Sequence, residues 1–409
     1  MQNEITPVYT TLQARREFWL FCVATFFACL TTSTISYLSV ILSTIGMTEK
    51  EIGGVLSSPL VPVTIAILFS GQMIARYSAL TVVFWGQALS LIAFLSFQYT
   101  VTDPFAAGVS RVVLGLGYGL FFPAALVYAK SKLQGPKTAY LFGIYASMIP
   151  LPNVIGPPIA EWYFKTFGIS FMFVVLSLPL IIGTLIMLTL GRGVQGEGSQ
   201  TRSGLEYWQL LKMKSIMIPL YSILVVGLVW GFVVSFLALQ LHRNGIRTAY
   251  FFSSCTVALF TSRFLVLGLL TNAPREVVAA LGLALMAVAF LALANAGTVS
   301  LVVLVAGIVF GFGYSMAFPV LSVWVSDQFR AEERGKPVAL LSALFQFGIY
   351  ALPFLVGILS NYLSLDILLI ILTSVATVFS LGLLFVYQVR RRNLVRIESV
   401  AAQCGVGKQ

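Results

Sequence analysis

The chain is short of charge. Only 10% of its 409 residues are Asp, Glu, Lys or Arg, whereas about a quarter of the residues are charged in a typical soluble domain. Hydrophobic residues make up 58% of the chain, so there is too little polar surface to cover a water-exposed fold of this size. A lipid bilayer removes that difficulty, because apolar side chains that face lipid need no protein to bury them. The composition therefore excludes an ordinary soluble domain and predicts a membrane protein.

Groups that commonly carry catalysis or bind metals are also scarce. The one histidine, His242, stands beside Arg243 without a nucleophile or a set of metal ligands at a suitable spacing. The four cysteines show no metal-ligand spacing either, and three of them lie in apolar runs, as small packing residues do. We therefore expect no enzyme activity, no metal and no cofactor.

The formal net charge is +11, which in a soluble protein would suggest nucleic acid as a partner. Here the basic residues stand in short segments between apolar runs, which is the distribution that the positive-inside rule requires. We expect the lipid bilayer to be the partner of this chain and expect no nucleic-acid binding.

Twelve apolar runs recur along the chain, each long enough to cross a bilayer as a helix of about 20 residues. The runs are 18–41, 52–74, 79–99, 104–129, 138–162, 169–190, 215–240, 248–271, 277–295, 299–325, 337–361 and 367–388. Nineteen Lys and Arg residues fall on the side that holds both termini, and four fall on the other side. This bias places both termini in the cytoplasm of a multi-pass protein. The compact size favours a bacterial inner membrane.

The chain also repeats itself. The segment GLGYGLFFP at 115–123 returns as GFGYSMAFP at 311–319, an offset of 196 residues, and FGIY at 142–145 returns at 347–350. Self-similarity in a fixed order is the mark of an internal duplication. We therefore predict two pseudo-symmetric bundles of six helices. The predicted parts are a cytoplasmic N-terminus (1–17), an N-terminal bundle (18–190), a cytoplasmic linker (191–214), a C-terminal bundle (215–388) and a basic tail (389–409).

The linker is the one long polar break in the chain. Its first part, up to Gly204, is rich in Gly and Ser, which is typical of a flexible connection. The segment 205–214 mixes aromatic, apolar and basic residues, so we expect a short amphipathic helix in the membrane interface that connects the two bundles.

Two six-helix halves joined in this way resemble the major facilitator superfamily. Arg111, followed by a glycine-rich stretch to Gly119, is similar to the fourth-helix motif of that family, and Gly156-Pro157 is similar to the Gly-Pro core of its antiporter motif. The segment that ends at Arg76 matches the motif between helices 2 and 3 weakly, because Ala75 stands where the family carries an aspartate. The resemblance implies a secondary transporter that works by alternating access, with Arg111 in proton coupling.

Two arginines, Arg111 and Arg263, lie inside predicted spans. An ionisable group at membrane depth is costly and faces a cavity or a partner. Two buried cations with few buried acids favour an anionic group on the substrate, held bidentately. Alternatively, Arg111 orders neighbouring helices through backbone carbonyls, and Arg263 extends to the cytoplasmic interface.

Other side chains of these spans suit a central cavity, although each also suits plain helix packing. The expected lining residues are Ser33, Ser36, Tyr37, Tyr118, Asn153, Trp230, Tyr314 and Gln346. The residues expected in coupling or gating are Arg76, Arg111, Gly156, Pro157, Glu161 and Asp327. Glu161 is interpreted either as a proton-binding carboxylate or, in preference, as part of a solvated rim. Asp327 is expected to join Arg330 and Arg334 in a cytoplasmic gate or surface cluster.

These features predict a monomeric transporter that exports a small anionic or amphipathic metabolite by proton antiport. The alternative is proton-coupled or facilitated uptake of an organic anion. A receptor or scaffold with a transporter-like fold belongs to another class, and the short loops disfavour it because they leave little room for a partner-binding domain.

Overall fold

The computed structural model describes residues 12–133, 138–190, 207–265, 273–330, 335–360 and 362–403. Within these ranges the chain forms helices and no strand. Nine helical segments of this part are long and apolar enough to cross a bilayer, and two shorter apolar helices accompany them. Helices suit this composition because each one satisfies its own backbone hydrogen bonds where no water is present. The predicted all-α membrane fold is confirmed.

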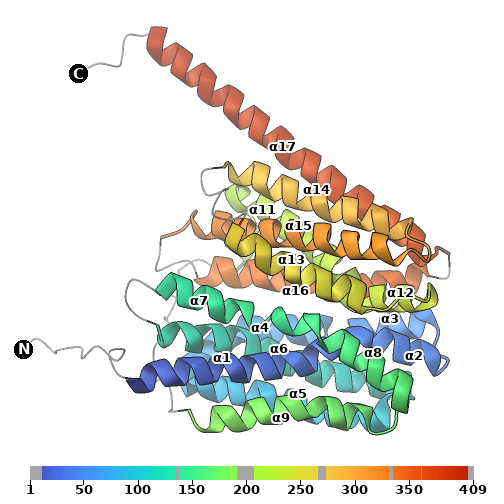
Figure 1. Ribbon diagram of the computed structural model, residues 1–409. Coiled ribbons are helices and arrows are strands. Elements are labelled where there is room, and N and C mark those ends of the chain that lie inside the picture. The colour runs from blue at the N-terminus through green and yellow to red at the C-terminus, as the bar shows by residue number, and fades with distance from the viewer. Residues whose placement is uncertain are drawn as a thin grey trace, which may run out of the picture.

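The first half of the chain forms the lower group of helices in Figure 1. Its elements are α1 (Leu12–Ser33), the 3-10 turn η1 (Thr34–Tyr37), α2 (Leu38–Thr44), α3 (Glu49–Ser57), α4 (Leu60–Tyr77), α5 (Ala79–Thr100), α6 (Pro104–Ser131), α7 (Thr138–Ser147), the 3-10 turn η2 (Leu151–Val154), α8 (Gly156–Phe167) and α9 (Met172–Leu188). The run 138–162 was predicted as one helix, but here it is divided into α7, η2 and α8. Four prolines between 150 and 158 account for the division, because proline lacks the N–H that continues a helix.

The second half forms the upper group in Figure 1. Its elements are α10 (Tyr207–Leu210), α11 (Lys214–Phe232), the π-helical segment η3 (Val233–Leu237), α12 (Ala238–Arg243), α13 (Ala249–Leu265), α14 (Arg275–Ala294), α15 (Ser300–Ser326), α16 (Gly335–Leu359) and α17 (Leu365–Gln403). The expected interfacial helix at 205–214 is a single turn, α10, where the described chain resumes. The glycine-rich part of the linker lies outside the described residues.

Successive long helices run back and forth between the two ends of the molecule. The first residue of α1 and the last of α17 lie at one end, called here the terminal end (Figure 1). The opposite end, called the far end, holds the turns 45–48, 101–103, 244–248 and 295–299. Helix α17 is 39 residues long and extends past the other helices at the terminal end (Figure 1).

The duplication seen in the sequence is a duplication of helix contacts. A Cβ built on Gly117 of α6 would lie 2.6 Å from the carbonyl oxygen of Gly86 on α5. In the second half, a Cβ on Gly313 of α15 would lie 2.6 Å from the carbonyl oxygen of Gly282 on α14. Both glycines of each pair recur at the offset of 196 residues. The repeated motif therefore permits the same close crossing of two helices in each half.

Candidate substrate site between the two halves

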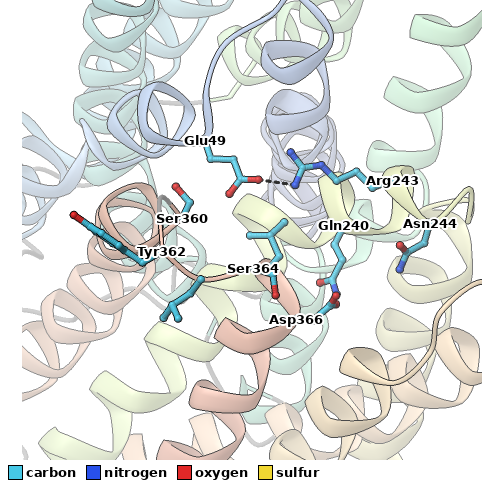
Figure 2. A pocket seen from close by; sticks show the side chains of 10 residues that line it. Glu49, Gln240, Arg243, Asn244, Ser360, Tyr362, Ser364 and Asp366 are labelled. Atoms are coloured by element: carbon cyan, nitrogen blue, oxygen red, sulfur yellow. Dashed lines mark hydrogen bonds and ion pairs between the residues drawn. The ribbon is translucent and has the colours of Figure 1, made fainter.

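The halves meet most closely at the far end, where α3 packs against α16. A Cβ on Gly53 would lie 2.5 Å from the carbonyl oxygen of Pro353 and 2.6 Å from Cα of Gly357. An ion pair also joins the halves there, since Nη1 of Arg243 on α12 lies 2.6 Å from Oε1 of Glu49 on α3. Figure 2 shows this pair among the side chains that line a cavity. These contacts close the far end.

A second set of contacts at the far end joins α8 to the start of α13. The backbone N–H and the hydroxyl of Thr248 donate to Oε2 of Glu161 at 2.8 and 2.6 Å. The Ser253 hydroxyl donates to the carbonyl oxygen of Val154 at 2.7 Å. A carboxylate is favoured in front of α13, because the N-terminus of a helix carries partial positive charge.

The cavity at the far end has a volume of about 400 Å³. It is lined by Glu49, Gln240, Arg243, Asn244, Ser360, Tyr362, Leu363, Ser364, Leu365 and Asp366. In Figure 2 the side chains of Gln240 and Asp366 lie together, and Gln240 Nε2 donates to Asp366 Oδ1 at 2.5 Å. Glu49 comes from the first half of the chain, whereas the other lining residues belong to the second half. The shape of the cavity therefore depends on the contact between the halves at the far end.

Arg111 lies two turns into α6 from the far end, at the boundary between the halves. It is 5% exposed. Its Nη2 donates to the carbonyl oxygen of Leu56 at 3.4 Å, and its Cζ lies 5.9 Å from the ring centroid of Tyr350 on α16. Its Nε has no hydrogen-bond partner. In the part of the chain that the structure describes, no carboxylate is paired with this guanidinium, so a buried cation is left with one long hydrogen bond and an aromatic ring.

Tyr118 stands two turns along α6 from Arg111. Its hydroxyl interacts with the side chain of Gln346 on α16, and the preceding residue of α16, Phe345, contacts the ring of Tyr314 on α15. Gln346 and Tyr350 are four residues apart, so they share one face of α16. Tyr118, Tyr314 and Tyr350 are only partly buried, although they lie between the halves. The structure thus brings together residues of α6, α15 and α16. Tyr118 of α6 belongs to the first half, and the residues of α15 and α16 belong to the second half.

An aromatic wall continues this cluster within the second half. Trp230 of α11 stacks on Tyr314 with ring centroids 4.3 Å apart and an interplanar angle of 22°. Phe318 stacks on Tyr314 at 5.8 Å, and Phe345 of α16 contacts Tyr314 at 6.3 Å and Phe318 at 4.9 Å. We call Trp230, Tyr314, Phe318 and Phe345 the aromatic wall. All four side chains are partly buried.

The expected lining residues of the first span lie elsewhere. Tyr37 is fully buried, and its ring meets Phe164 at 6.0 Å. The Ser33 hydroxyl donates to the carbonyl oxygens of Leu30 and Pro152 at 2.7 and 3.3 Å. The expectation assumed a continuous α-helix, whereas the 3-10 turn η1 follows Ser33 and redirects the side chains. These residues therefore pack helix against helix, and Ser36 is buried as well.

Asn153 and the Gly-Pro pair lie at the division of the fifth span. Asn153 Nδ2 donates to the carbonyl oxygen of Pro150 at 3.2 Å within η2. Gly156 begins α8, and a Cβ on it would collide with the side chain of Ser33. Pro157 is buried in the first turn of α8, where a missing N–H costs nothing. The pair thus starts a helix where α8 packs closely on α1.

Glu161 does not lie at a solvated rim. Its side chain is buried, and besides Thr248 it accepts from Lys165 Nζ at 2.6 Å. We expected exposure because Glu161 is near the outer end of a predicted span, but α13 of the other half covers it. The solvated-rim interpretation is therefore wrong.

The remaining expected gating residues lie at the terminal end. Asp327 follows α15 and pairs with Nη2 of Arg275 at the start of α14, a partner that we had not predicted. Arg76 ends α4 with its Cζ 5.2 Å from the ring centroid of Tyr77. The backbone of Arg263 is part of α13, but its side chain is outside the described residues, as is Arg334.

Tyr350 and Thr248 are among the contact residues that sequence reasoning missed. Tyr350 carried a signal, because it ends the second copy of the FGIY repeat, while Tyr145 of the first copy is buried in its own half. Thr248 carried a weaker one, since a threonine directly before a helix is a common cap. However, no feature of the sequence around Thr248 predicts that it pairs with Glu161 of the other half.

The family model of the Major Facilitator Superfamily matches residues 20–274 and 248–403, which is most of the chain. The chain belongs to the major facilitator superfamily. It is a membrane transporter whose transported compound and direction of transport the family does not specify.

This superfamily member is 27% identical over 88 residues to the multidrug transporter protein MdtP of Bacillus subtilis (strain 168). The match covers 22% of this chain and 16% of that protein's length. The structure of this chain also resembles two crystal structures over most of its length. One is the nucleoside transporter NupG, with a TM-score of 0.70 and 13% identity over 91% of this chain and 99% of that chain. The other is the D-xylose-proton symporter, with a TM-score of 0.72 and 15% identity over 91% of this chain and 96% of that chain. At such identities the likeness shows the fold alone.

Proposed function

We propose that this transporter exports a small organic anion across the cytoplasmic membrane by alternating access, in exchange for protons. The terminal end faces the cytoplasm, because nineteen of the loop and tail cations fall on that side and four on the other. The far end is then the outer end. The structure, with its far end closed by contacts of α3 with α16 and of α8 with α13, corresponds to a state closed to the outside.

The observation that carries the proposal is the environment of Arg111. A guanidinium that is 5% exposed and has one hydrogen bond of 3.4 Å is poorly compensated for its lost hydration. A carboxylate or phosphate group on a substrate supplies the missing acceptors, and Arg binds such groups in a bidentate way. The position between the halves fits, because superfamily folds hold substrates between two bundles that rock about them.

Several residues support coupling to protons and gating. Glu161 is a buried carboxylate at the seam between α8 and α13, and Gly156 and Pro157 start the helix that carries it. At the terminal end, Asp327 and Arg76 remain proposed gate residues. The chain acts as a monomer, and Arg263 stays a predicted second cation for the substrate.

Export is tested in inside-out membrane vesicles with an acidic interior. Radiolabelled benzoate, lactate and citrate are the test compounds, because they are organic acids of different size and charge. Proton antiport drives the accumulation of a transported acid inside these vesicles, and collapse of the pH gradient abolishes it. Efflux of preloaded acid under the same gradient indicates proton symport, which is the uptake alternative. A lack of gradient-dependent flux of all three acids refutes both.

Arg111 is tested with a matched pair of variants. Arg111→Gln removes the charge. Arg111→Lys keeps the charge but loses the planar guanidinium that binds a carboxylate through two N–H groups. Loss of one partner of a buried charge pair costs roughly 2–5 kcal/mol, so we expect binding of a transported acid to weaken by at least about thirtyfold in Arg111→Gln. Arg111→Lys is expected to fall between this variant and the parent. Equal affinities in all three proteins, with intact thermal stability, would remove Arg111 from the site.

A further inference from the structure

The surroundings of Arg111 combine a single cation with a wall of aromatic rings. Arg111 and Tyr118 are seven residues apart on α6, which corresponds to about 10 Å along the helix axis. The side chain of Gln346 meets Tyr118, and the preceding residue, Phe345, belongs to the aromatic wall and contacts Tyr314. A ligand of that length therefore reaches from the guanidinium to the wall while it stays between the two halves.

The polar groups of this region gather at one end. Gln346 and Tyr350 lie on α16 facing α6, where Tyr118 meets Gln346 and Arg111 approaches the ring of Tyr350. Beyond Tyr314 the wall consists of Trp230, Phe318 and Phe345, whose only polar group is the indole N–H. A sugar or a peptide carries hydrogen-bonding groups along its whole length, and such groups lose their water against this wall without gaining partners.

The wall suits a flat ring better than a flexible chain. Trp230 and Phe318 both stack on Tyr314, with ring centroids 4.3 and 5.8 Å away, and Phe345 meets Phe318 edge to face at 4.9 Å. Aromatic rings bind such surfaces in offset-stacked or edge-to-face arrangements that aliphatic groups do not gain from. A rigid ring also loses little conformational freedom on binding.

We propose that the substrate is a planar aromatic monocarboxylate, with its carboxylate on Arg111 and its ring against the aromatic wall. This inference rests on the proposed transport of an organic anion and adds the class of anion. One carboxylate is matched to Arg111, which among the described side chains is the buried guanidinium between the halves that has no carboxylate partner, whereas Arg243 is paired with Glu49. The ring is matched to the four aromatic side chains.

Three ligands of similar size separate the two parts of this proposal. They are 3-phenylpropionate, its amide, and 3-cyclohexylpropionate, and their binding to the purified full-length protein is measured by isothermal titration calorimetry. The acid and its amide differ in charge, which reports on Arg111. The phenyl and cyclohexyl acids differ in the ring, which reports on the wall. We expect 3-phenylpropionate to bind more tightly than the amide by at least tenfold, and more tightly than the cyclohexyl acid by roughly two- to tenfold.

Variants assign each difference to its residues. Trp230→Leu should abolish the preference for phenyl over cyclohexyl and keep the preference for acid over amide. Arg111→Gln should do the reverse, with Arg111→Lys as the second variant if Arg111→Gln fails to fold. Trp162→Leu is the matched control, because Trp162 is 60% exposed on α8 and should leave both preferences unchanged.

Each outcome bears on one part. Equal binding of the phenyl and cyclohexyl acids, both tighter than the amide, overturns the aromatic class and leaves organic-anion transport standing. Equal binding of acid and amide overturns the role of Arg111 on which the proposed function depends. A lack of detectable binding of 3-phenylpropionate up to its solubility limit overturns the proposed class of substrate.

Discussion

Closure of the far end depends on a glycine contact, and a single methyl group at that contact tests it. Gly53 on α3 has no room for a Cβ, which would lie 2.5 Å from the carbonyl oxygen of Pro353 and 2.6 and 2.9 Å from backbone atoms of Gly357. Ordinary contact begins at 3.4 Å. Because the atoms that it meets belong to the backbone, no side-chain rotation relieves the clash. In Gly53→Ala, α3 and α16 must separate by about 0.9 Å, the difference between 3.4 and 2.5 Å.

The energetic consequence is a shift in the balance between states. Overpacking of a close contact costs about 1–3 kcal/mol. Because the clash exists only when the far end is closed, this cost raises the population of the state open at the far end by roughly fivefold to a hundredfold. Gly54→Ala is the matched control, since a Cβ on Gly54 meets nothing within 4 Å.

Electron–electron distance measurements between two spin labels report this shift. Thr102 and Thr298 are exposed in far-end turns of the two halves and occupy equivalent places in the duplication. Cysteines at these positions, in a background without other cysteines, carry the labels. Gly53→Ala should move the distance distribution to longer values, and Gly54→Ala should match the parent. A distribution for Gly53→Ala that coincides with both would refute the conclusion that this contact controls closure.

Three further predictions concern contacts within and between the halves. Thr248→Val removes the hydroxyl donor to the buried carboxylate of α8, so the same labels should report a larger open population, and an unchanged distribution would speak against that seam. Gly117→Ala places a Cβ 2.6 Å from a backbone oxygen of α5 and should lower the thermal unfolding temperature in detergent, whereas Gly108→Ala on the same helix, with its nearest neighbour at 4.0 Å, should not. Arg390→Ala leaves the buried Glu276 without its partner at 2.8 Å. This variant should lower the unfolding temperature more than Arg391→Ala, because Arg391 is exposed.

The sequence predicted the architecture because the physical signals are strong over long stretches. Apolar runs of membrane length and a repeat at 196 residues indicate two bundles of helices, and both depend on composition and order alone. Arg111 was found for a similar reason, since a charge inside an apolar run is costly wherever the chain places it. Tyr118 and Tyr314 were found through the repeat that holds both.

Contacts between the halves were less predictable. Glu161 lies near the end of its span, and nothing local shows that Thr248 of the other half covers it. Ser33 and Tyr37 were assigned to a cavity on the assumption of regular helical spacing, which the 3-10 turn after Ser33 breaks. The direction of a side chain between two bundles depends on how they are docked, and that information is spread over residues more than 80 positions apart.

The length of α17 offers a place to attach a fusion domain for electron cryo-microscopy. At 1.5 Å per residue its 39 residues span about 58 Å, while a bilayer core is about 30 Å thick. The helix therefore continues well beyond the lipid at the terminal end, where a membrane protein of this size otherwise offers little mass for particle alignment. A soluble domain fused in helical register within 393–403 becomes a rigid extension of the second bundle, and its tilt relative to the first bundle becomes a direct gauge of the rocking motion.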